Sequence, residues 1–458
     1  MGCCSATSCK TNTKTPLTSI SLREYPRKTI LSIKSRAQNS IKKSKLDDVE
    51  FDLTNPVFAY SKRFNLGDKT FWASACVIPG FDPKGEIPKT CQDYSSFLKD
   101  DKSALLVLFD GHGPEGEKVV ERCGEIVEEF FSTRKAEFEE DPSSFLNELT
   151  KSCDDEVLGS TKFDSYYSGC TEVLVYFHGN NIHCASLGDS RAIIATTEPP
   201  EVMPAPTAAW GEDKKVLDEV RKRRNSVVNP EIKAIQLTKD QKPEDPEELM
   251  RIIKSGGRVQ RTVDENGNRI GPFRVWELNV NAPGLAMSRS IGDGMGTRVG
   301  VIAKPICTEY QLKGESDYFI VVASDGVWDV LDNQDVVNFV EYYRNKCRRE
   351  IEVVSNEEKV TQENACIAQL LCEEARVRWF SIVEEEDVLI DDISCVILEI
   401  NESQFFIGQS DMNKRPNLEP SISHIEMHEH RTPSLDDVIL RDPRRSSVVG
   451  KDEDLLKE

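Results

Sequence analysis

The sequence predicts an α+β protein with a layered body, and three observations support this fold class. Short runs rich in β-branched and aromatic residues are interspersed with amphipathic segments, as strands and helices are. The two kinds of segment do not alternate one for one, which argues against a doubly wound parallel sheet. Apolar residues make up 38% of the 458 residues, enough for a sizeable core.

The expected elements all fall between residues 51 and 402, which we take as the folded body. Strands are predicted at 70–79, 103–109, 171–177, 181–187, 191–196, 317–323 and 393–400. Helices are predicted where apolar residues recur every three or four positions, at 115–132, 143–158, 244–255, 333–348 and 357–377.

Three segments do not read as core. Residues 1–50 form a Ser-, Thr- and Lys-rich arm without a sustained amphipathic period. Residues 198–232 begin rich in proline and become highly charged, which is typical of a surface insertion. The Ser- and Glu-rich tail, 403–458, has few aromatic residues, and we expect it to be disordered.

Charge is distributed unevenly along the chain. The net charge is −21, yet residues 1–45 carry ten basic side chains against one acidic one, Glu24. The acidic remainder repels phosphate, which argues against a nucleic-acid partner. The fourteen cysteines form no CxxC pairs, which indicates reduced thiols in a cytoplasmic protein. The sequence contains no run of 18 apolar residues, so no membrane-spanning helix is predicted.

Aspartates recur where the predicted strands end. Asp110, Asp189 and Asp325 each follow an apolar run, and the pair Asp391-Asp392 precedes the last strand. If that strand is antiparallel to its neighbours, these carboxylates meet at one sheet edge, where they repel one another unless cations bind. One aspartate in a turn beside a strand is ordinarily only a turn residue, but four acidic strand ends in one body favour a site. Oxygen ligands without Cys, and with few His, favour Mg²⁺ or Mn²⁺, and no calcium-loop spacing is present.

An ordered series of motifs resembles the metal-dependent serine/threonine protein phosphatases of type 2C, also called PPM. The series spans about residues 70–400. It comprises Gln92-Asp93, Asp110-Gly111-His112-Gly113, Ser168-Gly169-Cys170-Thr171, Leu187-Gly188-Asp189-Ser190-Arg191, Leu237-Thr238-Lys239-Asp240-Gln241-Lys242-Pro243, Gly256-Gly257-Arg258-Val259, Leu285-Ala286-Met287-Ser288-Arg289-Ser290-Ile291-Gly292-Asp293, Asp325-Gly326-Val327-Trp328-Asp329 and Asp391-Asp392-Ile393-Ser394.

The resemblance implies a fold and a set of roles. The fold would be a four-layer α-β-β-α sandwich of two antiparallel sheets flanked by helix pairs. One core Mg²⁺ or Mn²⁺ would be held by Asp110, Asp325 and Asp391. A second would be held by Asp110 and the Gly111 carbonyl with help from Asp93, and a weaker third by Asp189 and Asp329. A metal-bridging hydroxide would attack phosphorus in line while His112 protonates the leaving serine or threonine oxygen.

Some positions depart from the family pattern. Gln92 stands where many members have Glu, and Pro88 where many have a phosphate-binding Arg. Lys89 then becomes the candidate for binding the substrate phosphate, and an ordinary surface lysine is the alternative. Gln241 replaces a frequent His, with an expected effect on packing only. No core metal ligand is lost, so we expect activity to survive.

The arm begins Met1-Gly2-Cys3-Cys4, which suggests acylation of Gly2 and palmitoylation of Cys3 and Cys4, although Ala6 departs from the myristoylation pattern. Two acyl chains beside a basic arm would attach the protein to an anionic membrane surface. A plain soluble tail is the alternative. Basic pairs also precede Ser226 and Ser447, which we therefore predict as phosphorylation sites.

The sequence thus predicts a monomeric protein phosphatase that acts on phosphoserine and phosphothreonine in phosphoprotein substrates, requires Mg²⁺ or Mn²⁺ and associates with membranes. Two rivals stay open. One is a weakly active, phosphatase-like module that recruits partners at a membrane, and the other is a small-molecule phosphatase, which the same metal site would serve.

Overall fold

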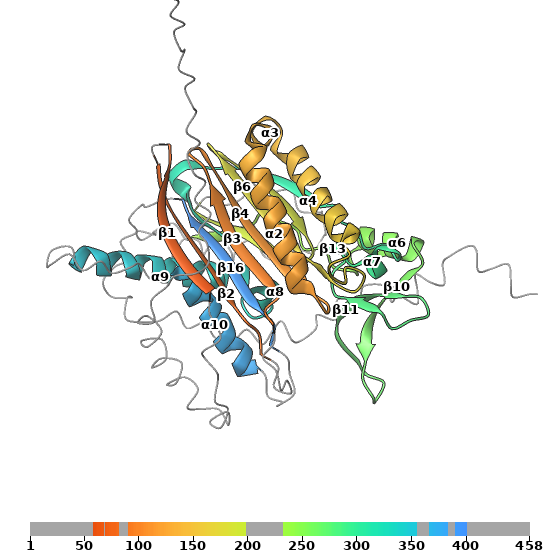
Figure 1. Ribbon diagram of the computed structural model, residues 1–458. Coiled ribbons are helices and arrows are strands. Elements are labelled where there is room, and N and C mark those ends of the chain that lie inside the picture. Colours follow the sequence, from red (N-terminus) through yellow and green to blue (C-terminus); the bar gives the residue numbers. More distant parts are fainter. Residues whose placement is uncertain are drawn as a thin grey trace, which may run out of the picture. The chain divides into compact units, whose positions relative to one another are not determined.

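A computed structural model describes residues 58–67, 69–81, 90–197, 232–354, 366–382 and 390–400 (Figure 1). One six-stranded sheet forms in them. Its strands lie in the order β1 (Phe58–Leu66), β2 (Lys69–Ile78), β16 (Ile393–Glu399), β15 (Asp317–Ala323), β8 (Arg191–Thr196) and β9 (Lys233–Gln236). Every neighbouring pair in this sheet is antiparallel.

A second, seven-stranded sheet is also antiparallel throughout. Its strands lie in the order β13 (Ile291–Gly292), β5 (Gly169–Cys170), β4 (Ser103–His112), β6 (Glu172–His178), β7 (Asn181–Leu187) and β14 (Ile306–Gln311), and β3 (Asp93–Lys99) pairs with β4.

The two sheets face each other across a buried apolar core. Alternation along β4 shows how the sequence builds it, because successive side chains of a strand point to opposite faces. Ala104, Leu106 and Leu108 join side chains of the other sheet, including Ile320, in the central cluster. The intervening residues, such as Leu105, pack instead with the helices on the outer face. A run that is apolar at every position therefore lies between two cores.

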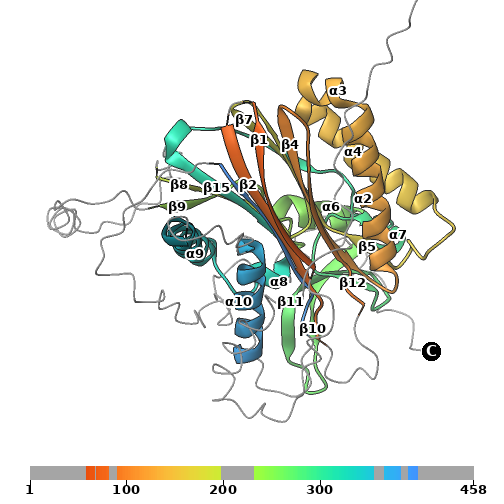
Figure 2. The same ribbon diagram turned by 60° about the vertical axis from the view of Figure 1, so that its left-hand side comes forward.

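Helices cover both outer faces, as Figures 1 and 2 show. The second sheet is covered by α2 (Gly116–Thr133) and α4 (Pro142–Gly159), joined by the short α3 (Lys135–Glu140), and the first by α9 (Asn333–Val354) and α10 (Ile367–Ile382). The molecule is thus an α-β-β-α sandwich, which confirms the predicted fold class. None of the helices in the described ranges is long and apolar enough to span a membrane.

A smaller unit projects beyond the sandwich (Figure 2). It comprises α6 (Pro246–Lys254), the three-stranded sheet of β10 (Gly257–Val263), β11 (Arg269–Glu277) and β12 (Pro283–Leu285), and the one-turn α7 (Gly294–Thr297). Its own small core includes Ile252, Val259 and Val275.

All seven predicted strands are present, with ends that differ by at most two or three residues. The hairpin β10–β11 was not predicted, because most of its side chains are exposed or half-buried and no alternation marks the strands. Strands β1 and β3 were missed for a similar reason, since polar residues interrupt their apolar ones. The arm, almost all of the insertion and the tail lie outside the described residues.

One acidic side chain is buried inside the fold, at the start of β6. Thr150 Oγ1 donates to Glu172 Oε1 (2.6 Å), and Glu172 Oε2 has no hydrogen-bond partner. Burial raises the pKa of this carboxyl group from 4.5 to about 8. The folded protein therefore binds this proton more tightly than the unfolded chain, so the contribution of Glu172 to stability is greatest below pH 4.5 and is lost as pH rises through about 8.

We expect Glu172→Gln to stabilise the protein against urea by about 1 kcal/mol or more near pH ~9, and much less near pH ~5, because the amide carries no charge to bury. Urea unfolding at the two pH values, in chelator, measures this. The exposed Glu121→Gln on α2 is the control. An equal effect of Glu172→Gln at both pH values would contradict the assignment.

Candidate metal centre and active site

The predicted acidic residues meet at one end of the sandwich, where both sheets contribute. Asp93 and Asp110 are directly opposite each other on β3 and β4 of the second sheet. Asp325 follows β15 at the start of α8 (Asp325–Trp328), and Asp391 precedes β16 in the first sheet. Because β15 and β16 are antiparallel, the end of one lies beside the start of the other. The sequence had suggested that the acids lie along the edge of one sheet. They lie instead between two sheets.

These carboxylates repel one another. Burial, and then the charges of Asp325 and Asp93, raise the pKa of Asp110 well above its usual value. Burial, with Asp189 and Asp329 next, does the same to the pKa of Asp325. Burial and the charge of Asp392 raise the pKa of Asp93 to about 8. Bound cations would offset the repulsion in such a cluster, so it favours cation binding.

Shielded carboxylate oxygens without hydrogen-bond partners give a second sign of a cation site. Both oxygens of Asp93 are in this state, as are Oδ1 of Asp325 and Oδ1 of Asp189. Hard oxygen donors of this kind suit Mg²⁺ or Mn²⁺. In the described ranges, no group of three acidic, His or Cys side chains is arranged to hold a metal ion as it stands. The donor chemistry fits the ions that the sequence implied.

Asp392, unlike the predicted ligand Asp391, has its carboxylate hydrogen-bonded to the backbone. Its carboxylate accepts hydrogen bonds from the backbone N–H groups of Gly80 (2.5 Å) and Gln92 (2.8 Å), which ties the entry to β3 against the start of β16. The Gln92 side chain points elsewhere and donates to the Gly113 carbonyl (2.8 Å). Gly326 lies so close that a Cβ there would be 2.1 Å from the Asp392 carbonyl oxygen, so this position has room only for glycine.

Asp189 already has a cationic neighbour that sequence reasoning did not single out. Lys242 Nζ is 2.6 Å from Asp189 Oδ2. Burial lowers the pKa of Lys242, but the charge and hydrogen bond of Asp189, together with the charges of Asp329 and Asp325, outweigh burial and raise it, so the ammonium stays protonated. Asp329, paired with Asp189 in the sequence prediction, is exposed just after α8.

The position of Asp189 depends on Gln241. The Gly188 N–H donates to Gln241 Oε1 (2.6 Å), and the Gln241 N–H donates back to the Gly188 carbonyl (2.9 Å). The same stretch is fastened to the small unit: the Ser288 N–H donates to the Gln241 carbonyl (3.0 Å), and the Ser288 hydroxyl donates to Glu248 Oε2 (2.6 Å). The effect of Gln241 thus extends beyond packing, since it supplies specific hydrogen bonds.

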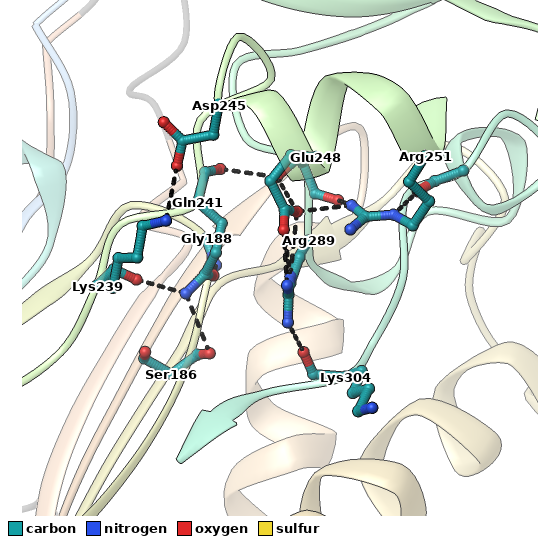
Figure 3. A network of polar contacts seen from close by, with 11 residues as sticks. Ser186, Gly188, Lys239, Gln241, Asp245, Glu248, Arg251, Arg289 and Lys304 are labelled. Atoms are coloured by element: carbon teal, nitrogen blue, oxygen red, sulfur yellow. Dashed lines mark hydrogen bonds and ion pairs between the residues drawn. The ribbon is translucent and has the colours of Figure 1, made fainter. Parts of the chain in front are cut away.

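Glu248 is the centre of that connection (Figure 3). Arg289 lies 2.6 Å from Glu248 Oε1 and Arg251 lies 2.7 Å from Oε2. Burial raises the pKa of Glu248, but the hydrogen bonds from the two guanidinium groups lower it to about 2. This ion pair holds α6 against the segment that carries Arg289, and so fixes the small unit beside the acidic cluster.

His112 ends β4 beside the acidic cluster and is paired with a residue of a quoted motif to which the sequence prediction gave no role. Its Nε2 lies 2.7 Å from Asp293 Oδ2, while its Nδ1 is buried without a partner. Burial lowers the pKa of the imidazole, but the charge and the hydrogen bond of Asp293 outweigh burial and raise it. A histidine that holds its proton in this way suits a general acid.

The remaining predicted functional residues lie outside the described residues: Lys89, Gly2, Cys3, Cys4, Ser226 and Ser447. The sequence gave no sign of the role of Asp293, because its partner His112 is 181 positions away in the sequence. Lys242 lay within a quoted motif, and only the fold shows which carboxylate it contacts.

Comparisons with known proteins point to one family. The family model described as protein phosphatase 2C matches residues 85–219 and 220–376. A rice protein, probable protein phosphatase 2C 48, is 32% identical over 293 residues, covering 60% of this chain and 73% of that protein. Probable protein phosphatase 2C 61 of Arabidopsis thaliana is 32% identical over 305 residues, covering 66% and 77%.

Among solved structures, the serine-threonine phosphatase 2C from Toxoplasma gondii shares the fold, with a TM-score of 0.50 at 17% identity, covering 75% of this chain and 99% of that one. The family match spans more than half of the chain and includes the residues from Asp93 to Asp329. The chain therefore belongs to the protein phosphatase 2C family of protein serine/threonine phosphatases.

Proposed function

We propose that this protein hydrolyses phosphoserine and phosphothreonine esters in proteins by means of divalent ions held at the acidic end of the sandwich. The observation that carries the proposal is the set of shielded, unpartnered carboxylate oxygens on Asp93, Asp189 and Asp325. In the proposal, the body at about residues 51–402 is the phosphatase domain.

Two ions would be held by residues from both sheets. Asp110, Asp325 and Asp391 would hold one, and Asp110 with the Gly111 carbonyl and Asp93 the other. When bound, Mg²⁺ or Mn²⁺ neutralises phosphate charge and lowers the pKa of water so that a nucleophile exists near neutral pH. A third ion at Asp189 and Asp329 would have to displace the Lys242 ammonium from Asp189.

His112 would supply the proton that the leaving oxygen needs. A serine or threonine alkoxide is a poor leaving group, so a positioned acid is worth roughly 10²–10⁴-fold in rate. The raised pKa of His112 supports this role, because it keeps the imidazole protonated at higher pH. Lys89 is retained as the candidate for gripping the substrate phosphate.

Phosphothreonine-peptide hydrolysis by the full-length protein tests the proposal. We expect turnover with Mn²⁺ or Mg²⁺ and none in chelator, and a loss of at least about 10²-fold in kcat for Asp325→Asn, because one ligand of the cluster is removed. Asp155→Asn on the exposed surface of α4 is the matched control and should keep full activity. Inactivity with every metal, in folded protein, would favour the binding module. Turnover of small phosphate esters alone would favour the small-molecule phosphatase.

The stability of the metal-free protein gives a readout that is independent of turnover. Removing one charge from a cluster of repelling carboxylates should stabilise it, so we expect Asp325→Asn to have a higher Tm than the unsubstituted protein in chelator. Added Mn²⁺ should stabilise the unsubstituted protein by about 2.7 kcal/mol at a hundredfold excess over Kd, and so raise its Tm, while the Tm of the variant should rise much less. Equal responses to Mn²⁺ would place the ion elsewhere.

We also propose that the N-terminal arm attaches the enzyme to membranes, supported by Gly2-Cys3-Cys4 at the start of an arm with ten basic residues and one acidic residue in its first 45. In cells fed alkyne-tagged myristate, we expect labelling and membrane fractionation of the full chain, and neither for Gly2→Ala. The paired change Cys3→Ser and Cys4→Ser should keep the label but lose most membrane binding, because a single acyl chain binds marginally. An unlabelled, soluble full chain would leave the arm as a plain soluble tail.

A further inference from the structure

Three short strands bring one carboxylate opposite the proposed general acid. At the end of β4, His112 pairs with Gly169 of β5, and Gly169 pairs in turn with Gly292 of β13. The three residues therefore lie side by side across the sheet, although they are far apart in the sequence. Asp293 is the next residue after Gly292, and its N–H donates to the Ser168 carbonyl (3.0 Å).

The glycine in the middle strand makes room for the Asp293 side chain to reach His112. A Cβ at Gly169 would lie 2.4 Å from Asp293 Oδ2, so any other residue there would collide with the carboxylate. Asp293 itself is the only non-glycine residue of the described ranges with a positive φ, 49°. Such a backbone conformation is uncommon and is concentrated at functional sites, where the surroundings hold it in place.

One oxygen of the Asp293 carboxylate contacts both His112 and Ser290. Asp293 is 1% exposed, and its Oδ2 accepts from Ser290 Oγ (2.5 Å) and lies 2.7 Å from His112 Nε2. With Nε2 bound in this way, Nδ1 is the nitrogen left for other chemistry, and it has no partner. The hydrogen bond restrains the ring and determines which nitrogen is available.

We propose that Asp293 is a positioning residue of the phosphatase reaction, which acts through His112 by holding Nε2 so that Nδ1 faces the leaving oxygen. The inference rests on the proposed function. As a hydroxide oxygen derived from water bonds to phosphorus, the P–O ester bond breaks and its electron pair goes to the serine or threonine oxygen, which takes the proton from Nδ1. The imidazole is left neutral, with its Nε2–H donated to Asp293.

Asp293→Asn is a sharp test because asparagine keeps the size of the side chain and tolerates a positive φ. With Mn²⁺ present, we expect kcat for a phosphothreonine peptide to fall by at least about tenfold. The kcat for p-nitrophenyl phosphate should change by less than about threefold, because nitrophenolate leaves without a proton. A loss of packing or of metal would lower both rates alike.

A double-mutant cycle asks whether Asp293 acts through the histidine. In a His112→Ala background, Asp293→Asn should cost nothing further on the peptide, since the group it positions is gone. Asp154→Asn is the matched control, because Asp154 Oδ1 accepts from the Gly292 N–H (2.9 Å) on the same strand without contacting His112. It should leave the ratio of the two rates unchanged.

Equal losses on both substrates, or a full additional loss in the His112→Ala background, would overturn the proposal, provided that circular dichroism shows Asp293→Asn to be folded. If that variant is unfolded, Ser290→Ala, which removes the other donor to Oδ2, replaces it with the same expected split between substrates. The proposed function fails separately, through an unsubstituted protein that does not hydrolyse the peptide with any metal.

Discussion

Mutual repulsion among shielded carboxylates is the constraint on which the rest of the structure depends. Asp93, Asp110 and Asp325 are pressed together by strands whose own cores are apolar, so the free energy of their approach must come from those cores. Nothing in the packing of the sheets requires acids at this end. The fold therefore gives up stability in order to create a strong demand for cations.

The surrounding contacts limit how the cluster can relax. Arg191 donates to Asp240 (2.6 Å) and Asn333 (2.7 Å) and lies over the Trp328 ring, so it joins the segment bearing Asp189 to the segment between β9 and α6 and to α9. Glu248 fastens the small unit from another side. With the segments joined on both sides of the cluster, repulsion is relieved more easily by a bound cation than by separation of the segments.

The sequence was most informative where chemistry and pattern coincide. Runs such as Asp317–Ala323, buried at every position, predict strands whatever their partners, and an aspartate at the end of such a run predicts a place in the site. The sequence was least informative where the role of a residue depends on a partner that is far away along the chain. Asp293 and Lys242 have ordinary local surroundings in the sequence, and only the register of β13, β5 and β4 gives Asp293 its partner. The exposed hairpin β10–β11 carries too little apolar alternation to be recognised.

The bond between Asp392 and the Gly80 N–H joins residues 312 positions apart. During synthesis, every strand of the body except β16 leaves the ribosome before the acidic end of the sandwich can close. A nascent or truncated chain that ends before Asp391 therefore lacks both this clamp and the central strand between β2 and β15. The acidic end of the sandwich is therefore completed only in the last tenth of the folded body to be translated, and a fragment that ends earlier lacks one of its carboxylates.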